Sequence, residues 1–497
     1  MKAEMTHTRL ESILERAFET TRGKIQVTGA ASPLALAYFL SQTYSKKINS
    51  LPHMVVVGSL SEAQRLKSLL EFFDPTRHAH ILPAFDVSPY SSLYPNSRIA
   101  SDRISFLAKA QQAKAGEIFI APSDALMQKS LPVKFLKEHS RLIRAGDELP
   151  EDISEYLNSL GYSSAPMVED KGQYAMRGGI VDLFPPTEEQ PIRLDLFGDQ
   201  VETIRHFSVA DQRSTEDVTS FYLTPAREAL FRDENHERLL QRVRATLENR
   251  ATDKADAEEM LRSLVLKNAF PGLDFLLPYF YGDLVHPTEH FSGAVNLWFL
   301  DPVEISRCAD EFLAELKADY ATSTQQVIRP ELDLLYAPFE KIIFPQNSRQ
   351  VYFSSLEYFE EESSENARIE YKTYLTQDFT NLALANPAGS EGWLQAATSK
   401  LHRWKEDGYR LFVGTKNQSQ IERLKLVFEK LGLKGVKTNE DEYRWDTWLM
   451  EQERDSSLLH IIPRYLPESL RLEEEKVLFL RDEDFYGKKQ RSKETSG

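Results

Sequence analysis

The sequence has few of the features that mark secreted or membrane-spanning proteins. Its single cysteine, Cys308, excludes an internal disulfide, so nothing in the sequence calls for an oxidising compartment. No apolar run approaches the ~20 residues that cross a bilayer. Residues 1–16 mix charges with Thr and His and lack the apolar core of a signal peptide. These absences lead us to expect a cytoplasmic protein.

Positive charge is also scarce, since 60 Lys and Arg stand against 76 Asp and Glu, a net charge of −16. Proteins that grip a phosphate backbone usually carry a basic footprint, because Lys and Arg release its counterions. The charge balance therefore favours protein partners over DNA. The hydrophobic fraction of 41% and charged fraction of 27% are typical of a globular chain. A length of 497 residues predicts three or four compact units.

The pattern of apolar residues divides the chain into regions of different secondary structure. Short buried strands at 25–27, 54–57 and 117–120 alternate with helices, which predicts a largely parallel sheet. Residues 161–207 are β-rich, and residues 214–335 are mainly helical. An acidic linker at 351–369 then leads to a second α/β unit at 370–487.

One strand of the β-rich region carries an unusual outer face. Alternate residues of a strand share a face, so Ile192, Leu194 and Leu196 point toward a core and Arg193, Asp195 and Phe197 point away from it. Arginine and aromatic residues are typical of protein-protein hot spots. The alternative is that another layer covers Phe197 and that Arg193 only pairs with Asp195. The strand alone leaves both interpretations open.

A resemblance extends over nearly the whole chain. Residues 173–185, Gln-Tyr-Ala-Met-Arg-Gly-Gly-Ile-Val-Asp-Leu-Phe-Pro, resemble the hallmark segment of the excision-repair protein UvrB and of the transcription-repair coupling factors (Mfd). Further segments are similar in the same order: residues 91–103, 121–128, 192–197, 204–207, 212–215, 223–228 and 481–487. The polymerase-binding domain and the two-lobed translocase of the coupling factors have no counterpart in this sequence.

The resemblance implies an α/β fold with three domains. We expect a degenerate UvrB-like, P-loop-type parallel α/β domain in two segments, 1–122 and 214–335. An inserted β-rich α+β module, residues 123–213, would separate those segments. A linker at 336–369 would lead to a second, separate small α/β domain at 370–490.

The resemblance also implies a function in transcription-coupled nucleotide excision repair. In the coupling factors the inserted module docks on the excision-repair protein UvrA through two arginines and a phenylalanine, which fall here on Arg177, Arg193 and Phe197. Arg205 and Arg213 are candidate supporting residues. The parent of such a segment would be an ATP-dependent translocase that displaces stalled RNA polymerase, and it would reach DNA and polymerase through domains absent here.

The loop that binds phosphate in UvrB-like proteins is degenerate in this chain. It begins at Gly29, but the places of the second glycine, the lysine and the Ser/Thr hydroxyl hold Ala31, Ser32 and Pro33. The positive charge is missing, and proline removes a backbone donor at the start of the helix. We therefore expect no nucleotide binding, no ATPase activity and no cofactor.

The sequence speaks against three other functions. A UvrB-like helicase or nuclease would turn over ATP, which the degenerate loop opposes. A UvrB-like module that binds damaged DNA would need an aromatic-rich hairpin early in the first domain, and residues 29–40 contain none. The run from His286 to His290 fits the H-x-x-E-H zinc pattern, but it lies in a Tyr-, Gly- and Pro-rich connection. We expect a surface loop there and no metal.

Overall fold

The structure is a computed structural model. It describes residues 9–21, 23–42, 47–74, 78–91, 93, 95–248, 254–323, 328–355, 366–376, 378–386, 390–416, 418–433, 436–438 and 459–486.

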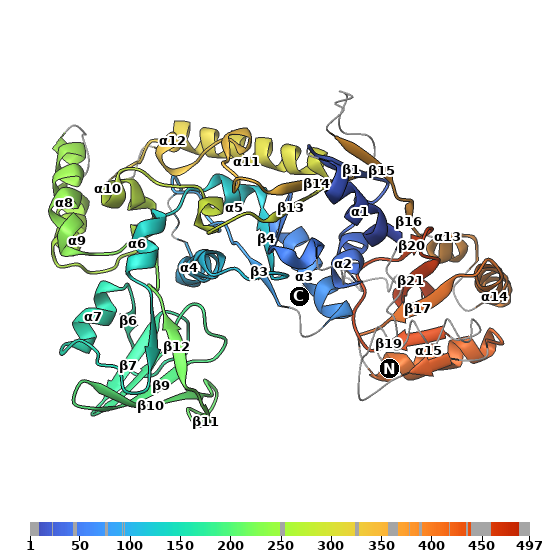
Figure 1. The fold of residues 1–497 in the computed structure, drawn as a ribbon, viewed down its shortest axis with the longest axis horizontal. Coiled ribbons are helices and arrows are strands. Elements are labelled where there is room, and N and C mark those ends of the chain that lie inside the picture. Colours follow the sequence, from blue (N-terminus) through green and yellow to red (C-terminus); the bar gives the residue numbers. More distant parts are fainter. Residues whose placement is uncertain are drawn as a thin grey trace, which may run out of the picture.

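A seven-stranded parallel sheet forms the centre of the first domain (Figure 1). Its strand order is β15-β1-β14-β13-β2-β4-β3, and every neighbouring pair is parallel, as the alternation of strands and helices predicted. The strands are β1 (Ile25–Thr28), β2 (His53–Val57), β3 (Ala79–Ile81), β4 (Ile118–Pro122), β13 (Asn296–Leu300), β14 (Arg349–Ser354) and β15 (Ala367–Glu370).

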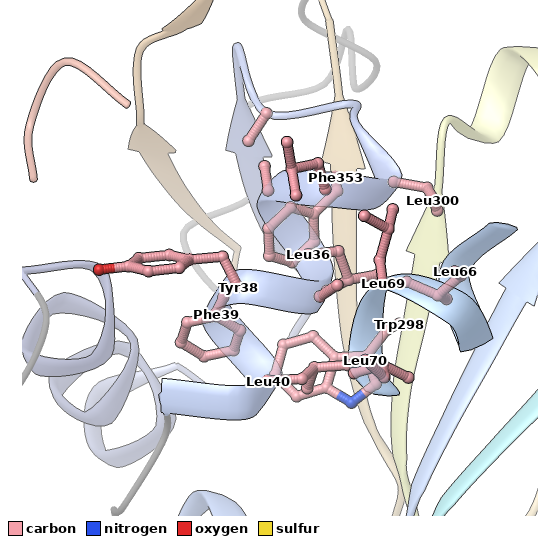
Figure 2. Close-up of a cluster of buried hydrophobic side chains, with 14 of the residues drawn as sticks. Leu36, Tyr38, Phe39, Leu40, Leu66, Leu69, Leu70, Trp298, Leu300 and Phe353 are labelled. Carbon is pink, nitrogen blue, oxygen red and sulfur yellow. The ribbon is translucent and has the colours of Figure 1, made fainter. Parts of the chain in front are cut away.

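Both faces of this sheet are buried under helices. Successive side chains of a strand point to opposite faces, so Val55 and Val57 belong to one core and Met54 and Val56 to the other. Figure 2 shows the first core, where Trp298 packs against Phe39 and Phe353. The first core includes α1 (Arg9–Thr20), α2 (Pro33–Gln42) and α3 (Leu60–Phe73); the second includes α4 (Ser97–Gln111), α5 (Ser123–Met127), α6 (Val133–Glu138) and α11 (Pro302–Thr322). Shorter helices on the same domain are α12 (Leu332–Leu335), η1 (Ile48–Ser50), η3 (Pro287–His290) and η4 (Phe339–Lys341).

The inserted module is built on a second sheet of order β11-β10-β9-β8-β7-β6. All its pairs are antiparallel except β6 with β7. Its strands are β6 (Ser163–Ser164), β7 (Gln173–Arg177), β8 (Ile180–Leu183), β9 (Ile192–Phe197), β10 (Gln200–Phe207) and β11 (Ser214–Asp217); β5 (Arg141–Arg144) pairs with β12 (Ser220–Leu223), and α7 (Ile153–Ser159) packs on the same core.

The predicted limits of the module, 123–213, are wrong at both ends. Residues 125–136 contribute Ala125, Leu126 and Leu136 to the second core of the first domain. At the other end β11 pairs with β10 and β12 pairs with β5, so the chain stays in the module until after Leu223. The pairing of β11 with β10 and of β12 with β5 sets the second boundary, and such pairing cannot be predicted from composition.

A helical segment follows the module and carries a small core of its own. The core includes Leu239, Val243 and Leu264. In Figure 1 the hairpin of α8 and α9 stands at one end of the molecule. The elements are α8 (Asp233–Glu248), α9 (Lys254–Val265), η2 (Leu273–Leu276) and α10 (Leu277–Tyr281).

The predicted linker at 336–369 is also wrong for the residues that the structure describes. Strand β14 lies between β1 and β13 in the middle of the first sheet, and β15 extends the sheet beyond β1. The acidic run at 360–365 lies outside the described residues. The two strands flank the charged run and carry charged residues of their own, so composition alone does not separate them from a linker.

The third domain contains a mixed sheet of order β16-β20-β21-β17-β19-β18. Helices of the third domain cover one face of this sheet. The other face contributes Phe412 and Phe479 to the core around α2 and α3. The ring of Phe479 lies 5.7 Å from that of Tyr38 and 5.4 Å from that of Phe73. This domain is therefore not separate, because it shares a core with the first. Its elements are β16 (Thr373–Leu375), β17 (Arg410–Gly414), β18 (Val436–Thr438), β19 (Leu459–Ile462), β20 (Leu470–Leu472), β21 (Val477–Arg481), α13 (Asp378–Ala385), α14 (Glu391–Glu406), α15 (Gln418–Lys430) and α17 (Glu483–Tyr486).

None of the helices within the described ranges combines the length and the apolar character that a bilayer span requires.

Candidate functional site

The residues predicted to dock a partner lie on one face of the module sheet. In the register of the strands, Arg177 is opposite Ile180, and Ile180 is opposite Asp195. Asp182 is opposite Arg193, and Arg193 is opposite Arg205. Residues opposite one another project from the same face. The other face carries Val181, Leu194 and Ile204 into the module core. We call the first face the outer face.

Phe197 stands at the end of β9 and is the most exposed aromatic side chain of the outer face. Its exposed fraction is 76%, so within the described residues no layer covers it. Gly198 follows with a φ of 60°, which turns the chain into β10. Ile180, on the neighbouring strand, is 38% exposed. The end of β9 therefore presents apolar surface, with Phe197 as its most prominent group.

Arg177 lies at the end of β7 and keeps most of its hydrogen-bonding capacity for solvent. Its side chain is exposed, and one guanidinium nitrogen donates to the carbonyl of Pro166 at 2.9 Å. An arginine carries five N–H donors in a fixed fork. Arg177 is thus anchored by one bond while the rest of its fork remains available to an acceptor.

Arg193 is held inside the module. Its Nε and Nη2 donate to the two carboxylate oxygens of Asp182 at 2.7 and 2.9 Å, and Nη1 donates to the carbonyl of Gln212 at 3.1 Å. The guanidinium carbon lies 4.7 Å from the ring centre of Phe207, and only 16% of the side chain is exposed. The hydrogen bond to Asp182 raises the pKa of Arg193. Arg193 therefore pairs with Asp182 and not, as the alternative had it, with Asp195.

The two candidate supporting residues have different surroundings. Arg205 forms an ion pair with Asp195, which also accepts from the hydroxyl of Thr203. Arg193 and Arg205 are opposite one another, and each like charge has its own carboxylate partner, Asp182 for Arg193 and Asp195 for Arg205. Arg213 is exposed in the turn after β10, next to Gln212. It lies toward the Arg193 end of β9, roughly 13 Å along the strand from Phe197. The structure thus brings Arg177, Arg193, Phe197 and Arg205 onto one face and leaves Arg213 at its margin.

Three residues of this face were missed from the sequence: Asp182, Phe207 and Ile180. Asp182 is buried although it stands between Val181 and Leu183 on a short apolar strand. A buried carboxylate requires a partner, so an aspartate within an apolar strand indicates a cation paired with it. The exposure of Ile180 depends on its place beside the Gly178–Gly179 turn and had no local signal.

The degenerate loop after β1 is occupied by other parts of the chain. Gly29 has a φ of 82°, and a Cβ added to it would lie 2.8 Å from the carbonyl oxygen of Tyr371. Its own carbonyl accepts from the backbone and hydroxyl of Thr373. The space beside Gly29 is thus filled by the chain that leads into the third domain. Ala30 is buried next to this loop, and Pro33 opens α2 directly after Ser32.

Replacing Gly29 by alanine should lower the free energy of unfolding by roughly 1–3 kcal/mol, because a left-handed residue gains a Cβ that meets a backbone oxygen. Gly116 is a matched control: its φ is 80° and nothing lies within 4 Å of its added Cβ. Urea denaturation of both variants would separate the backbone cost from the steric cost. Equal losses would show that the contact with Tyr371 contributes nothing.

The H-x-x-E-H run forms a 3-10 helix, η3, in which His290 is buried. Its ring nitrogens lie 3.1 Å from Gln111 Nε2 and 3.2 Å from Ser130 Oγ, and burial lowers its pKa to about 4. Among the described residues no group of three or more His, Cys, Asp and Glu is placed to hold a metal ion. His290 is therefore a buried anchor, and the prediction of a surface loop is wrong for it.

Comparison with known proteins gives one family and a set of relatives. Residues 142–228 match the UvrB interaction domain, close to the limits that the sheet pairing sets for the module. The chain is 29% identical over 354 residues to the transcription-repair-coupling factor of Myxococcus xanthus, which is 69% of this chain and 29% of that protein. With the coupling factor of Escherichia coli it shares 28% identity over 309 residues, 62% of this chain and 26% of the relative. With that of Bacillus subtilis it shares 23% over 447 residues, 87% of this chain and 37% of the relative.

The chain therefore spans 26% to 37% of the length of these relatives. The match covers most of its own length, and the module, whose outer face gathers the predicted docking residues, coincides with the matched domain. The chain is thus homologous to the transcription-repair-coupling factors over much of its length, and it contains a UvrB interaction domain.

Proposed function

We propose that this chain recruits UvrA to sites of transcription-coupled repair through the outer face of its module and performs no catalysis itself. The observation that carries the proposal is the exposure of Phe197, at 76%, beside Ile180 and on the same face as Arg177. Central aromatic and arginine anchors dominate the energy of most protein-protein interfaces. In a longer coupling factor, RNA polymerase and DNA would be reached by other domains, which would also supply ATP-driven translocation.

The three predicted residues have different parts in this mechanism. Phe197 fills an apolar pocket on UvrA, and the free donors of Arg177 reach an acceptor beside it. Arg193 is a positioning residue, since Asp182, Gln212 and Phe207 already occupy most of its guanidinium. It fastens the turn after β10 to the sheet and keeps the outer face in one shape.

Titration calorimetry of the chain with purified UvrA tests the proposal. The parent chain should bind, and a double variant, Arg177→Ala with Phe197→Ala, should not bind while it remains folded. Leu142→Ala removes an exposed apolar side chain from β5 of the same module and serves as the matched control. If the parent chain does not bind UvrA, the proposal is wrong. Equal binding by the parent and the double variant would retain the partner and discard the face.

The positioning role of Arg193 makes a distinct prediction. Asp182→Asn should weaken UvrA binding roughly tenfold, although only 4% of the Asp182 side chain is exposed and it cannot touch a partner. Arg193→Ala should weaken it by a similar factor, and both should lower the free energy of unfolding of the module by about 1–3 kcal/mol. If Arg193 instead donated directly to UvrA, Asp182→Asn would leave the affinity nearly unchanged.

We also propose that the first domain does not hydrolyse ATP. Ala31, Ser32 and Pro33 supply neither the lysine nor the second glycine of a phosphate loop, and backbone atoms of residues 371–373 fill the space beside Gly29. An assay of phosphate release from ATP by the chain, with and without DNA, should give the rate of the buffer blank. A rate that rises with the concentration of the chain, and survives a further step of purification, would contradict this.

A further inference from the structure

The start of α2 is occupied by a carboxylate from the third domain. Ser32 precedes this helix, and its hydroxyl accepts from the amides of Leu34 at 3.2 Å and Ala35 at 3.3 Å. The same hydroxyl donates to Glu468 Oε1 at 2.9 Å. The amide of Leu34 also lies 3.2 Å from that carboxylate oxygen. Glu468 is thus bound where a helix start offers free N–H groups and positive potential.

A basic side chain completes this contact. Arg65, on α3, forms an ion pair with the other oxygen of Glu468, and 11% of the Glu468 side chain is exposed. One backbone amide, a hydroxyl and a cation thus surround this carboxylate, and helix starts bind phosphate through donors of this kind. Here 434 residues separate Leu34 from the carboxylate that takes this place.

The same segment of the third domain makes an opposite contact at the end of α3. Arg464 Nη1 donates to the carbonyls of Glu71 at 2.7 Å and Phe72 at 3.0 Å, in the last turn of that helix. The carbonyl end of a helix carries negative potential, so a cation is favoured there. Between the two charged residues, Leu466 is buried in the core that the two domains share. Residues 464–468 therefore match an anion to a helix start and a cation to a helix end.

We propose that the start of α2 is a retained oxyanion site that the chain fills with its own Glu468, and that residues 464–468 thereby fix the third domain on the first without any nucleotide. On this proposal the loop does not need the phosphate-binding residues, because the carboxylate of Glu468 takes the place of a phosphate. The fold keeps the electrostatic site at the helix start, but the ligand is internal and permanent. The third domain gains a role by this contact, because it supplies the anion that the first domain would otherwise lack.

The proposal is tested on the full chain by removing the carboxylate and offering inorganic phosphate in its place. In Glu468→Ala, hydrogen exchange of the Leu34 and Ala35 amides should speed up roughly tenfold or more, the effect of losing one charge-assisted hydrogen bond. Phosphate, compared with chloride at equal ionic strength, should slow this exchange again. Glu422→Ala, which removes an exposed carboxylate from α15, should show neither effect.

Two further variants keep the result unambiguous. Glu468→Gln retains the shape of the side chain, so it replaces the alanine variant in the experiment if that variant fails to fold. In Glu468→Gln the amides of Leu34 and Ala35 should exchange faster than they do in the parent chain. Adding Arg65→Gln to Glu468→Ala should weaken the phosphate effect, because the cation of the site is then missing. Parent-like exchange in both Glu468 variants would overturn the proposal. So would equal protection by phosphate in the parent, Glu468→Ala and Glu422→Ala, which is a general salt effect.

Discussion

Replacing Phe197 by alanine should weaken UvrA binding by about 2–4 kcal/mol, or roughly 30- to 700-fold, while the stability of the folded chain stays within about 0.5 kcal/mol of the parent. The two parts of this expectation have one cause. Phe197 is 76% exposed in the free chain, so its removal opens no cavity. In a complex it would be the large aromatic anchor of the face, and its burial would become the main apolar gain.

Calorimetry with UvrA, together with thermal unfolding of the free variant, measures both quantities. Phe197→Leu is an informative companion, because it keeps apolar area and loses the flat ring; its affinity should lie between those of parent and alanine variant. Val209→Ala, at an exposed apolar position in the turn after β10, is a control on the same module. A loss of affinity in Phe197→Ala that equals the loss in Val209→Ala would mean that Phe197 is no anchor.

The local pattern of the sequence was sufficient to predict the orientation of this face. Alternation along 192–197 separates Ile192 and Leu194, which are buried, from Arg193 and Phe197, which are not in the core. The partner of Arg193 could not be predicted in the same way. It depends on the register of β9 against β8, and the connection of 184–191 between them does not fix that register.

The errors in the domain limits have a similar origin. Strand β14 enters the first sheet between β1 and β13, although more than 300 residues separate it from β1. Nothing in the six residues of β14 predicts which strand it will join. The contact of Glu468 with Leu34 is also distant in sequence, so no local pattern predicts it. Local periodicity predicted the elements, and long-range pairing decided their grouping.

Replacing Arg103 by methionine should lower the free energy of opening of the first domain by about 3–5 kcal/mol, the usual cost of leaving one partner of a buried ion pair alone. Arg103 on α4 and Glu228 just after β12 are both buried, and Arg103 Nε donates to Glu228 Oε1 at 2.6 Å. The other carboxylate oxygen accepts from the Leu131 amide at 3.1 Å, and Arg103 Nη1 donates to the Pro83 carbonyl at 3.0 Å. The pair thus joins the first domain to the segment that leaves the module.

Hydrogen exchange of the β4 amides, next to which α4 packs, measures this free energy within one domain of a multidomain chain. Arg98→Met on the same helix is the control, because Arg98 and Asp102 form an exposed pair and its loss should cost less than about 1 kcal/mol. In the double variant Arg103→Met with Glu228→Met the unpaired charge disappears, so the total loss should be smaller than the sum of the two single losses. Additive losses would mean that the two side chains stabilise the domain separately. The ion pair would then contribute nothing to the junction between the first domain and the module.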